Sequence, residues 1–146
     1  MSLSDPTKKM SKSDSNPKSF VLLMDSPDDI MRKFKSAVTD SESSVKRGEG
    51  RDGINNLITI YSVAAGKTPE EVELEFEGKG YGEFKVAVGE AVVELLRPVR
   101  EKTEELLKNK DYLEKMYQEG ALKAARLATR TLDKVKRKVG FVKRAR

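Results

Sequence analysis

The 146 residues of the chain include no cysteine, no histidine and no tryptophan. The absence of cysteine excludes disulfides, thiolate metal sites and cysteine nucleophiles. The absence of histidine excludes Ser-His-Asp hydrolysis, histidine acid–base catalysis and the usual zinc sites. Aromatic residues make up only 6% of the chain, which predicts an aliphatic core. The chemistry that remains is binding, or catalysis by lysine, serine and carboxylate side chains.

Long apolar runs are also missing. No run approaches the roughly 20 residues that a membrane-spanning helix needs. The apolar stretch at residues 20–24 is too short for the core of a signal peptide and lies too far from the start. We therefore expect a soluble, cytoplasmic protein with no membrane partner. The length suits one domain, with 37% apolar residues to build its core.

Charge is spread unevenly along the chain. The net charge is +5, but residues 120–146 carry ten basic residues and one acid, or +9, whereas the first 119 residues sum to −4. Four of these basic residues recur three or four positions apart, which places them on one helix face: Arg126, Arg130, Lys134 and Arg137. Such a face favours a polyanionic partner, and a merely solvated helix face is the equal alternative.

Capping signals and apolar spacing predict helices in the first half of the chain. Residues 1–18 are polar and form a loop, and residues 19–24 form a short strand or a buried extended segment. Ser-Pro-Asp-Asp and Thr-Pro-Glu-Glu sequences then start a helix over 27–38 and a short helix around 72–76. A helix over 54–65 lies between them and ends at a glycine.

The second half predicts two long helices. The first follows the glycines at 78–82, and Pro98 should kink or split it. The second covers 112–139 after a break at 109–111, with an alanine-rich face, and Gly120 is a point where it could divide. The whole pattern predicts an all-α fold, a helical bundle preceded by a flexible loop and at most one short strand.

The sharpest chemical signal lies in the N-terminal loop. Residues 8–14 read KKMSKSD, so three lysines and two serines lie close together. Ammonium and hydroxyl groups suit a polyphosphate, and mobile lysines stabilise the charge that moves onto phosphates during adenylyl or phosphoryl transfer. On composition alone, an ordinary lysine- and serine-rich tail is the alternative.

The neighbouring residues decide in favour of function. Residues 9–13 are identical to the KMSKS signature of class I aminoacyl-tRNA synthetases. The flanking segments resemble bacterial tryptophanyl-tRNA synthetases, in register from about residue 3 to residue 140. The segments that carry this resemblance are 5–7, 14–18, 35–42, 53–58, 60–62, 77–85, 96–98 and 119–121.

The resemblance implies an enzyme, a tryptophan–tRNA ligase that activates tryptophan with ATP and attaches it to tRNA(Trp). Lys9 and Lys12 would be its catalytic contacts to the ATP phosphates, with Lys12 the stronger assignment. Ser11 and Ser13 would hydrogen-bond the phosphates or fix the loop, and Met10 would anchor it by packing. Mg²⁺ would accompany ATP, and no metal site built from side chains is expected. Asp14, which follows the signature, would cap the next turn or orient Lys12.

The resemblance also implies a division of the chain. Residues 1–25 would hold the signature loop and a remnant of the catalytic domain, and residues 26–146 the helical anticodon-binding domain. The basic face at Arg126, Arg130, Lys134 and Arg137 would contact tRNA phosphates. Base-reading residues are not assigned; the candidates, for each of which packing is the alternative role, are Asn55, Asn56, Tyr61, Tyr81, Tyr112 and Tyr117.

A nucleotide-binding half is expected elsewhere. The family's enzymes carry a HIGH-type ATP motif and a tryptophan pocket in a Rossmann domain, and neither occurs in this sequence. We therefore interpret the chain as the C-terminal part of a longer enzyme, inactive alone and homodimeric at full length. A stand-alone helical RNA-binding module without catalysis is the alternative, and a helical protein–protein scaffold is a third.

Overall fold

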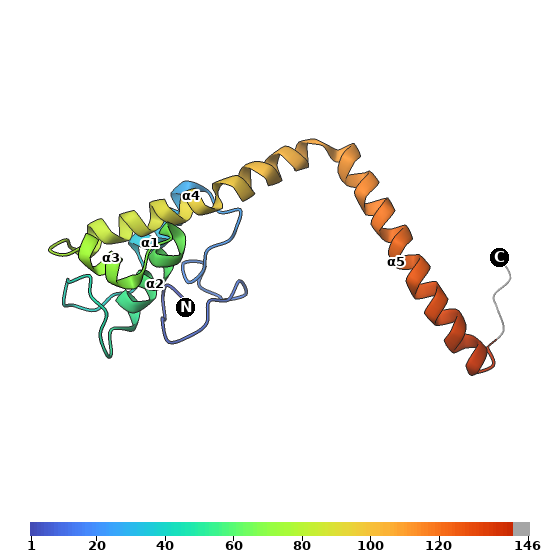
Figure 1. Ribbon diagram of the computed structural model, residues 1–146, viewed down its shortest axis with the longest axis horizontal. Coiled ribbons are helices and arrows are strands. Elements are labelled where there is room, and N and C mark those ends of the chain that lie inside the picture. The colour runs from blue at the N-terminus through green and yellow to red at the C-terminus, as the bar shows by residue number, and fades with distance from the viewer. Residues whose placement is uncertain (142–146) are drawn as a thin grey trace. The chain divides into compact units, whose positions relative to one another are not determined.

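The computed structural model describes residues 1–141 and contains five helices and no strand within them (Figure 1). The helices are α1 (Pro27–Lys35), α2 (Asp52–Ala65), α3 (Pro69–Glu75), α4 (Tyr81–Lys108) and α5 (Lys110–Lys138). The prediction of an all-α fold is confirmed, and the optional strand at 19–24 does not form. The chain divides into two compact units, Met1–Glu101 and Lys102–Arg146. No helix in the described part of the chain is long and apolar enough to cross a membrane.

The starts of α1 and α3 follow the predicted capping pattern. The Ser26 hydroxyl accepts a hydrogen bond from the Asp29 amide at 3.1 Å, with a proline in the first turn behind it. Thr68 and Glu71 form a reciprocal capping box, in which the Thr68 amide donates to the Glu71 carboxylate at 2.7 Å. Because the first amides of a helix have no partner within the helix, these side chains fix where each helix begins.

The ends of the helices agree with the sequence in one case and differ in another. Gly66 ends α2 with a φ of +67°, a conformation that glycine adopts without steric cost. By contrast, α1 ends at Lys35 rather than at 38. The reason is that the Val38 amide donates to the Leu3 carbonyl at 2.8 Å, so residues after 36 leave the helix to pair with the N-terminal segment.

The two long helices are less interrupted than predicted. α4 continues across Pro98, so the expected division there is wrong, and α5 continues through Gly120. Pro98 and Glu94, whose carbonyl loses its helical partner, are both exposed, so water can satisfy that carbonyl. The predicted break is confirmed at Asn109, whose side chain accepts from the Tyr112 amide at 3.2 Å and starts α5.

The core of the first unit is formed by residues from α1 to α4 and from the loops around them. Its buried members include Leu3, Ile30, Phe34, Val45, Ile54, Leu57, Ile58, Val72, Val88 and Val92. The core also contains Tyr61, Phe76 and Phe84, whose rings pack edge to face, with centroid distances of 4.8 Å for Phe76–Phe84 and 5.4 Å for Tyr61–Phe76. The core is therefore aliphatic with an aromatic cluster inside it, which the low aromatic content did not suggest.

The second unit contains the exposed helix α5, in which no residue is buried. The alanine-rich face that we expected to pack closely against a neighbouring helix is exposed at each of its alanines.

Gly53 lies where two backbone segments come too close for a side chain. A methyl group on Gly53 would lie 2.4 Å from the Val38 carbonyl oxygen and 3.0 Å from the Thr39 Cα atom. Because backbone cannot yield as a side chain does, Gly53→Ala is expected to lower the free energy of unfolding by about 2 kcal/mol. Gly82→Ala is the matched control, since a methyl group there meets nothing within 4 Å. Urea midpoints of the two variants check this, and equal midpoints would contradict it.

Candidate functional site

The lysine-rich loop is tied to the first unit at both of its ends. The Ser2 amide donates to the Lys8 carbonyl and the Leu3 amide to the Ser19 carbonyl, each at 2.9 Å. The Leu3 side chain is 2% exposed and belongs to the core. Within the loop, Met10 is half-buried and packs against the same core. The loop therefore projects from fixed ends, and Met10 has the packing contact that we expected of it.

The two lysines of the signature point outward without partners. Lys9 and Lys12 are exposed and form no ion pair with any residue among 1–141. Lys8 differs from them, because its ammonium pairs with the Asp5 carboxylate at 2.7 Å. Two lysines in the loop thus present ammonium groups to solvent, where they can bind an anion such as a phosphate.

Hydrogen bonds among its serines shape the turn of the loop. The Ser11 and Ser13 hydroxyls lie 3.0 Å apart, and the Asp14 amide donates to the Ser11 carbonyl at 3.2 Å. The Asp14 carboxylate accepts from the Asn16 amide at 2.8 Å. Of the two roles foreseen for Asp14, the contacts match the capping of the next turn.

The basic residues of α5 lie on a single exposed helix. Arg126, Arg130, Lys134 and Arg137 are all exposed, and none forms an ion pair within the described chain. The Arg137 guanidinium donates to the Asp133 carbonyl one turn earlier, at 3.3 Å. Their spacing keeps all four on one face, together with the single acid Asp133, so this face of α5 carries an excess of positive charge.

A buried charge network joins three elements of the first unit. Arg51 is 8% exposed and forms a two-pronged contact with the Asp40 carboxylate at 2.9 and 3.2 Å. It also donates to the carbonyls of Ser44 at 2.9 Å and Lys46 at 2.6 Å. The Tyr81 hydroxyl accepts from Arg51 at 2.6 Å and donates to Asp40. The network fixes the loop at 40–46 against the starts of α2 and α4.

These contacts shift the pKa values of the network. Hydrogen bonding to the Arg51 guanidinium holds the pKa of the Asp40 carboxyl well below its usual range. The same pairing raises the pKa of Arg51. Burial, with the hydrogen bond to Asp40, raises the pKa of Tyr81 to about 12. The network is therefore an ion pair, with a protonated tyrosine, throughout the neutral range.

Most candidates for reading bases are engaged in packing. The Asn55 side chain bonds the Gly48 amide and carbonyl at 3.1 and 2.8 Å, and Asn56 donates to the Met1 and Ser2 carbonyls at 3.2 Å. The Tyr61 ring is buried in the aromatic cluster, and the Tyr81 hydroxyl belongs to the charge network. Of the six, only the two tyrosines on α5, at positions 112 and 117, have exposed rings.

Comparison with known proteins places this geometry in a family. The sequence profile of the class I tRNA synthetases (W and Y) matches residues 1–97, which contain the lysine loop and the charge network. The chain belongs to this family. Bacterial relatives named tryptophan–tRNA ligase match almost the whole of this synthetase chain: 49% identical over 142 residues in Wolinella succinogenes and 50% over 147 in Bacillus anthracis. These two matches cover 97% and 100% of this chain, but only 43% and 44% of the length of the relatives.

Solved structures give the same result for the synthetase fold. The tryptophanyl-tRNA synthetase of Campylobacter jejuni matches 91% of this chain and 42% of its own, with a TM-score of 0.73 and 28% identity. That of Mycoplasma pneumoniae matches 72% of this chain and 34% of its own, with a TM-score of 0.65 and 32% identity. The synthetase chain therefore spans less than half the length of the relatives that it matches.

The charge network is the part of the synthetase chain that sequence reasoning missed. Asp40 and Tyr81 lie inside the family-like segments 35–42 and 77–85, and Arg51 lies just before a third. The available signal was a charged or hydroxyl-bearing residue inside or next to each of these segments, which are far apart in sequence. Only the fold shows that the three side chains meet.

The network makes the stability of the synthetase chain depend on acid pH. Because the folded pKa of Asp40 lies below the 3.8 of a free aspartate, the unfolded state binds more protons in acid. The stabilisation is therefore complete above about pH 4 and is lost as the pH falls further. We expect the urea midpoint to fall more steeply below pH 4 in the wild type than in Asp40→Asn, and parallel falls would contradict the assignment.

Proposed function

We propose that this chain is part of a tryptophan–tRNA ligase, which activates tryptophan with ATP and attaches it to tRNA(Trp). The observation that supports the proposal most directly is the KMSKS loop, in which both Lys9 and Lys12 are exposed, in a chain about 50% identical to tryptophan–tRNA ligases over almost its whole length. Residues 1–25 then belong with the catalytic domain, and residues 26–146 form the anticodon-binding domain. The parent enzyme acts in the cytoplasm as a homodimer.

The residues of the loop fit a triphosphate. Lys9 and Lys12 supply mobile positive charge, and the Ser11 and Ser13 hydroxyls supply hydrogen-bond donors beside them. The tryptophan carboxylate attacks the α-phosphorus of ATP, and pyrophosphate leaves. The lysines act by binding the phosphates more strongly as charge accumulates on the departing pyrophosphate. Mg²⁺, when bound to ATP, neutralises part of the phosphate charge.

A chimera tests the proposed activity. The matched part of the Bacillus subtilis tryptophan–tRNA ligase, to which this chain is 46% identical, is replaced by residues 1–146. The chimera is expected to catalyse tryptophan-dependent exchange of pyrophosphate into ATP, whereas the chain alone is expected to show none. Exchange by the chain alone would contradict its assignment as the part that lacks the tryptophan pocket. An inactive chimera that binds tRNA would favour the alternative of a stand-alone RNA-binding module. The basic face of α5 is the observation that supports this alternative.

The proposed tRNA contact on α5 predicts a salt effect. Arg126, Arg130 and Lys134 carry three uncompensated charges, so each should displace counterions from tRNA phosphates. Changing all three to glutamine is expected to weaken binding of a tRNA(Trp) transcript and to lower the slope of log Kd against log salt by about 2. Filter binding at several salt concentrations measures this slope. The matched control changes the exposed Lys108, Lys110 and Lys115 to glutamine. An equal loss of tRNA affinity in that variant would contradict the assignment of the contact to one face of α5.

A further inference from the structure

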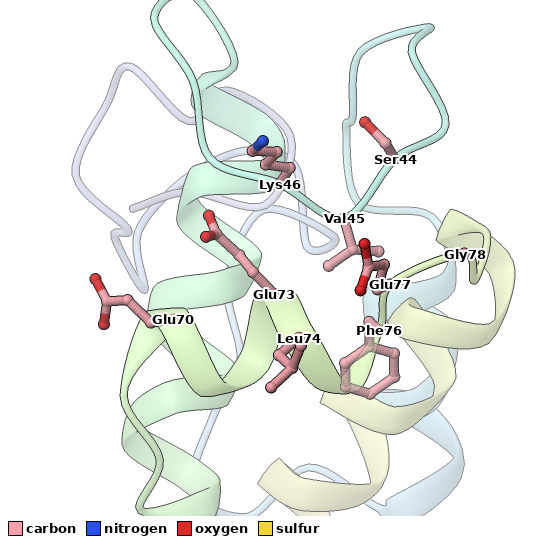
Figure 2. A pocket seen from close by; sticks show the side chains of 9 residues that line it. All are labelled: Ser44, Val45, Lys46, Glu70, Glu73, Leu74, Phe76, Glu77 and Gly78. Carbon is pink, nitrogen blue, oxygen red and sulfur yellow. The ribbon is translucent and has the colours of Figure 1, made fainter.

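A cavity of about 420 Å³ lies between the loop at 44–46 and the end of α3 (Figure 2). Its volume is within the usual range of ligand pockets, about 300–1,000 Å³. The apolar part of its wall is formed by Val45, Leu74 and Phe76, and Leu74 is 74% exposed. Figure 2 shows Leu74 and Phe76 on one side of the cavity, with Lys46 and Ser44 above them on the loop. The cavity thus combines an apolar surface with a polar rim.

The walls of the cavity are held in place from behind. Arg51 bonds the carbonyls of Ser44 and Lys46, which fixes the backbone of the loop. On the opposite side, the Phe76 ring is 4% exposed and packs edge to face on Tyr61 and Phe84. A ligand would therefore meet a preformed wall and would lose little affinity to ordering it.

The carboxylates at the cavity are not equivalent. Arg47 pairs with Glu70 at 2.7 Å and with Glu73 at 3.0 Å, and this pairing keeps the pKa values of both carboxyls low. Glu77 and Lys46 form no ion pair with any described residue. Three carboxylates and two cations, Lys46 and Arg47, therefore lie at the cavity, which leaves a net charge of about −1, and Glu77 and Lys46 are the two groups without an ion-pair partner in the described part of the chain. A cationic ligand would find most of the negative charge already neutralised.

We propose that this cavity receives one unstacked base of the tRNA anticodon, with Glu77 accepting a hydrogen bond from the exocyclic amino group of the base. The proposal rests on the proposed function. Single-stranded RNA is read by bases that leave the stack, cover apolar surface and present their Watson–Crick edge to side chains. A carboxylate accepts from an amino group and rejects the carbonyl of uracil or guanine. Lys46 lies where it can bind the phosphate next to the base.

The chemistry of the anticodon agrees with an acceptor in this position. The tryptophan codon UGG pairs with the anticodon CCA, and each of these three bases carries an exocyclic amino group. Replacing cytosine by uracil, or adenine by guanine, turns that donor into an acceptor while the base keeps its size class. A pocket in which Glu77 accepts a hydrogen bond from the base would therefore distinguish cytosine from uracil, or adenine from guanine, at one anticodon position.

Binding of four tRNA transcripts to the 146-residue chain tests the proposal. They carry the anticodon CCA and its three single changes: C to U at the first position, C to U at the second, and A to G at the third. One change is expected to weaken binding to the wild type by about tenfold. In Glu77→Gln that difference should disappear, because an amide both donates and accepts. Glu49→Gln, an exposed glutamate outside the cavity, is the matched control and should keep the discrimination.

The outcomes separate this proposal from the proposed function. If all four transcripts bind the wild type equally, or if Glu77→Gln discriminates as the wild type does, the pocket assignment is overturned while tRNA binding stands. If no transcript binds, both the pocket and the proposed tRNA contact fail. Leu74→Ser removes apolar wall without altering charge and is expected to weaken all four transcripts several-fold. Unchanged binding by that variant would also overturn the proposal.

Discussion

Replacing Lys12 by alanine in the chimera is expected to slow tryptophan-dependent pyrophosphate exchange by about a hundredfold. Lys12 is exposed and has no ion-pair partner among the described residues, so its ammonium is available to the phosphates of ATP. Removal of one positioned group that stabilises transition-state charge typically costs about 10²–10³ in rate. The loss should appear in kcat at saturating ATP, because the interaction strengthens as pyrophosphate departs.

Lys18→Ala is the matched control for this prediction. Lys18 is also exposed and lies in the same polar segment, outside the KMSKS sequence. The Lys18→Ala substitution removes the same charge as Lys12→Ala, so a general loss of positive potential would slow both variants alike. Equal rates for Lys12→Ala and the unmodified chimera would show that the loop does not act on the phosphates. Lys12→Arg keeps the charge but changes its geometry, and partial activity in that variant would indicate that position matters as well as charge.

Local sequence signals predicted the parts of the fold that are decided locally. Ser26 and Thr68 start helices because their oxygens accept from amides three residues away, and Gly66 ends one because it tolerates a positive φ. The divisions foreseen at Pro98 and Gly120 do not occur, because α4 and α5 each continue as one helix through these residues. A glycine costs about 1 kcal/mol in a helix, and the hydrogen bonds of a helix nearly 30 residues long outweigh one unfavourable position.

Contacts between distant segments could not be predicted in this way. Capping and apolar spacing extended α1 to residue 38, but pairing of Val38 with Leu3 ends it earlier. The signature loop was found because a contiguous sequence carries it. By contrast, Asp40 lies 11 residues from Arg51 and 41 residues from Tyr81, and no local pattern relates them. The cavity at 44–78 depends on this network, so it could not be predicted either.

Arg51→Met is expected to have the largest effect on stability, a loss of about 3 kcal/mol in the free energy of unfolding of the first unit. Methionine fills similar volume but removes the cation that pairs with the Asp40 carboxylate, and with it the donor to the Tyr81 hydroxyl and to the Lys46 carbonyl. Breaking a buried pair by removing one partner costs about 3–5 kcal/mol, because the remaining charge stays desolvated. The expected value is at the low end, since the Asp40 side chain is 22% exposed.

Arg47→Met tests whether this loss depends on burial rather than on charge. Arg47 also contacts two acids, Glu70 and Glu73, but its side chain is 38% exposed, compared with 9% for Arg51. Water and salt screen an exposed pair, so its loss should lower the free energy of unfolding far less than the loss of Arg51 does. Amide NMR signals of α2, followed through a urea titration, report unfolding of the first unit alone. Equal losses in the two variants would mean that the Arg51 network is an ordinary surface ion pair. The larger loss expected at Arg51 would show that this buried arginine holds the loop at 40–46 in the position on which the cavity depends.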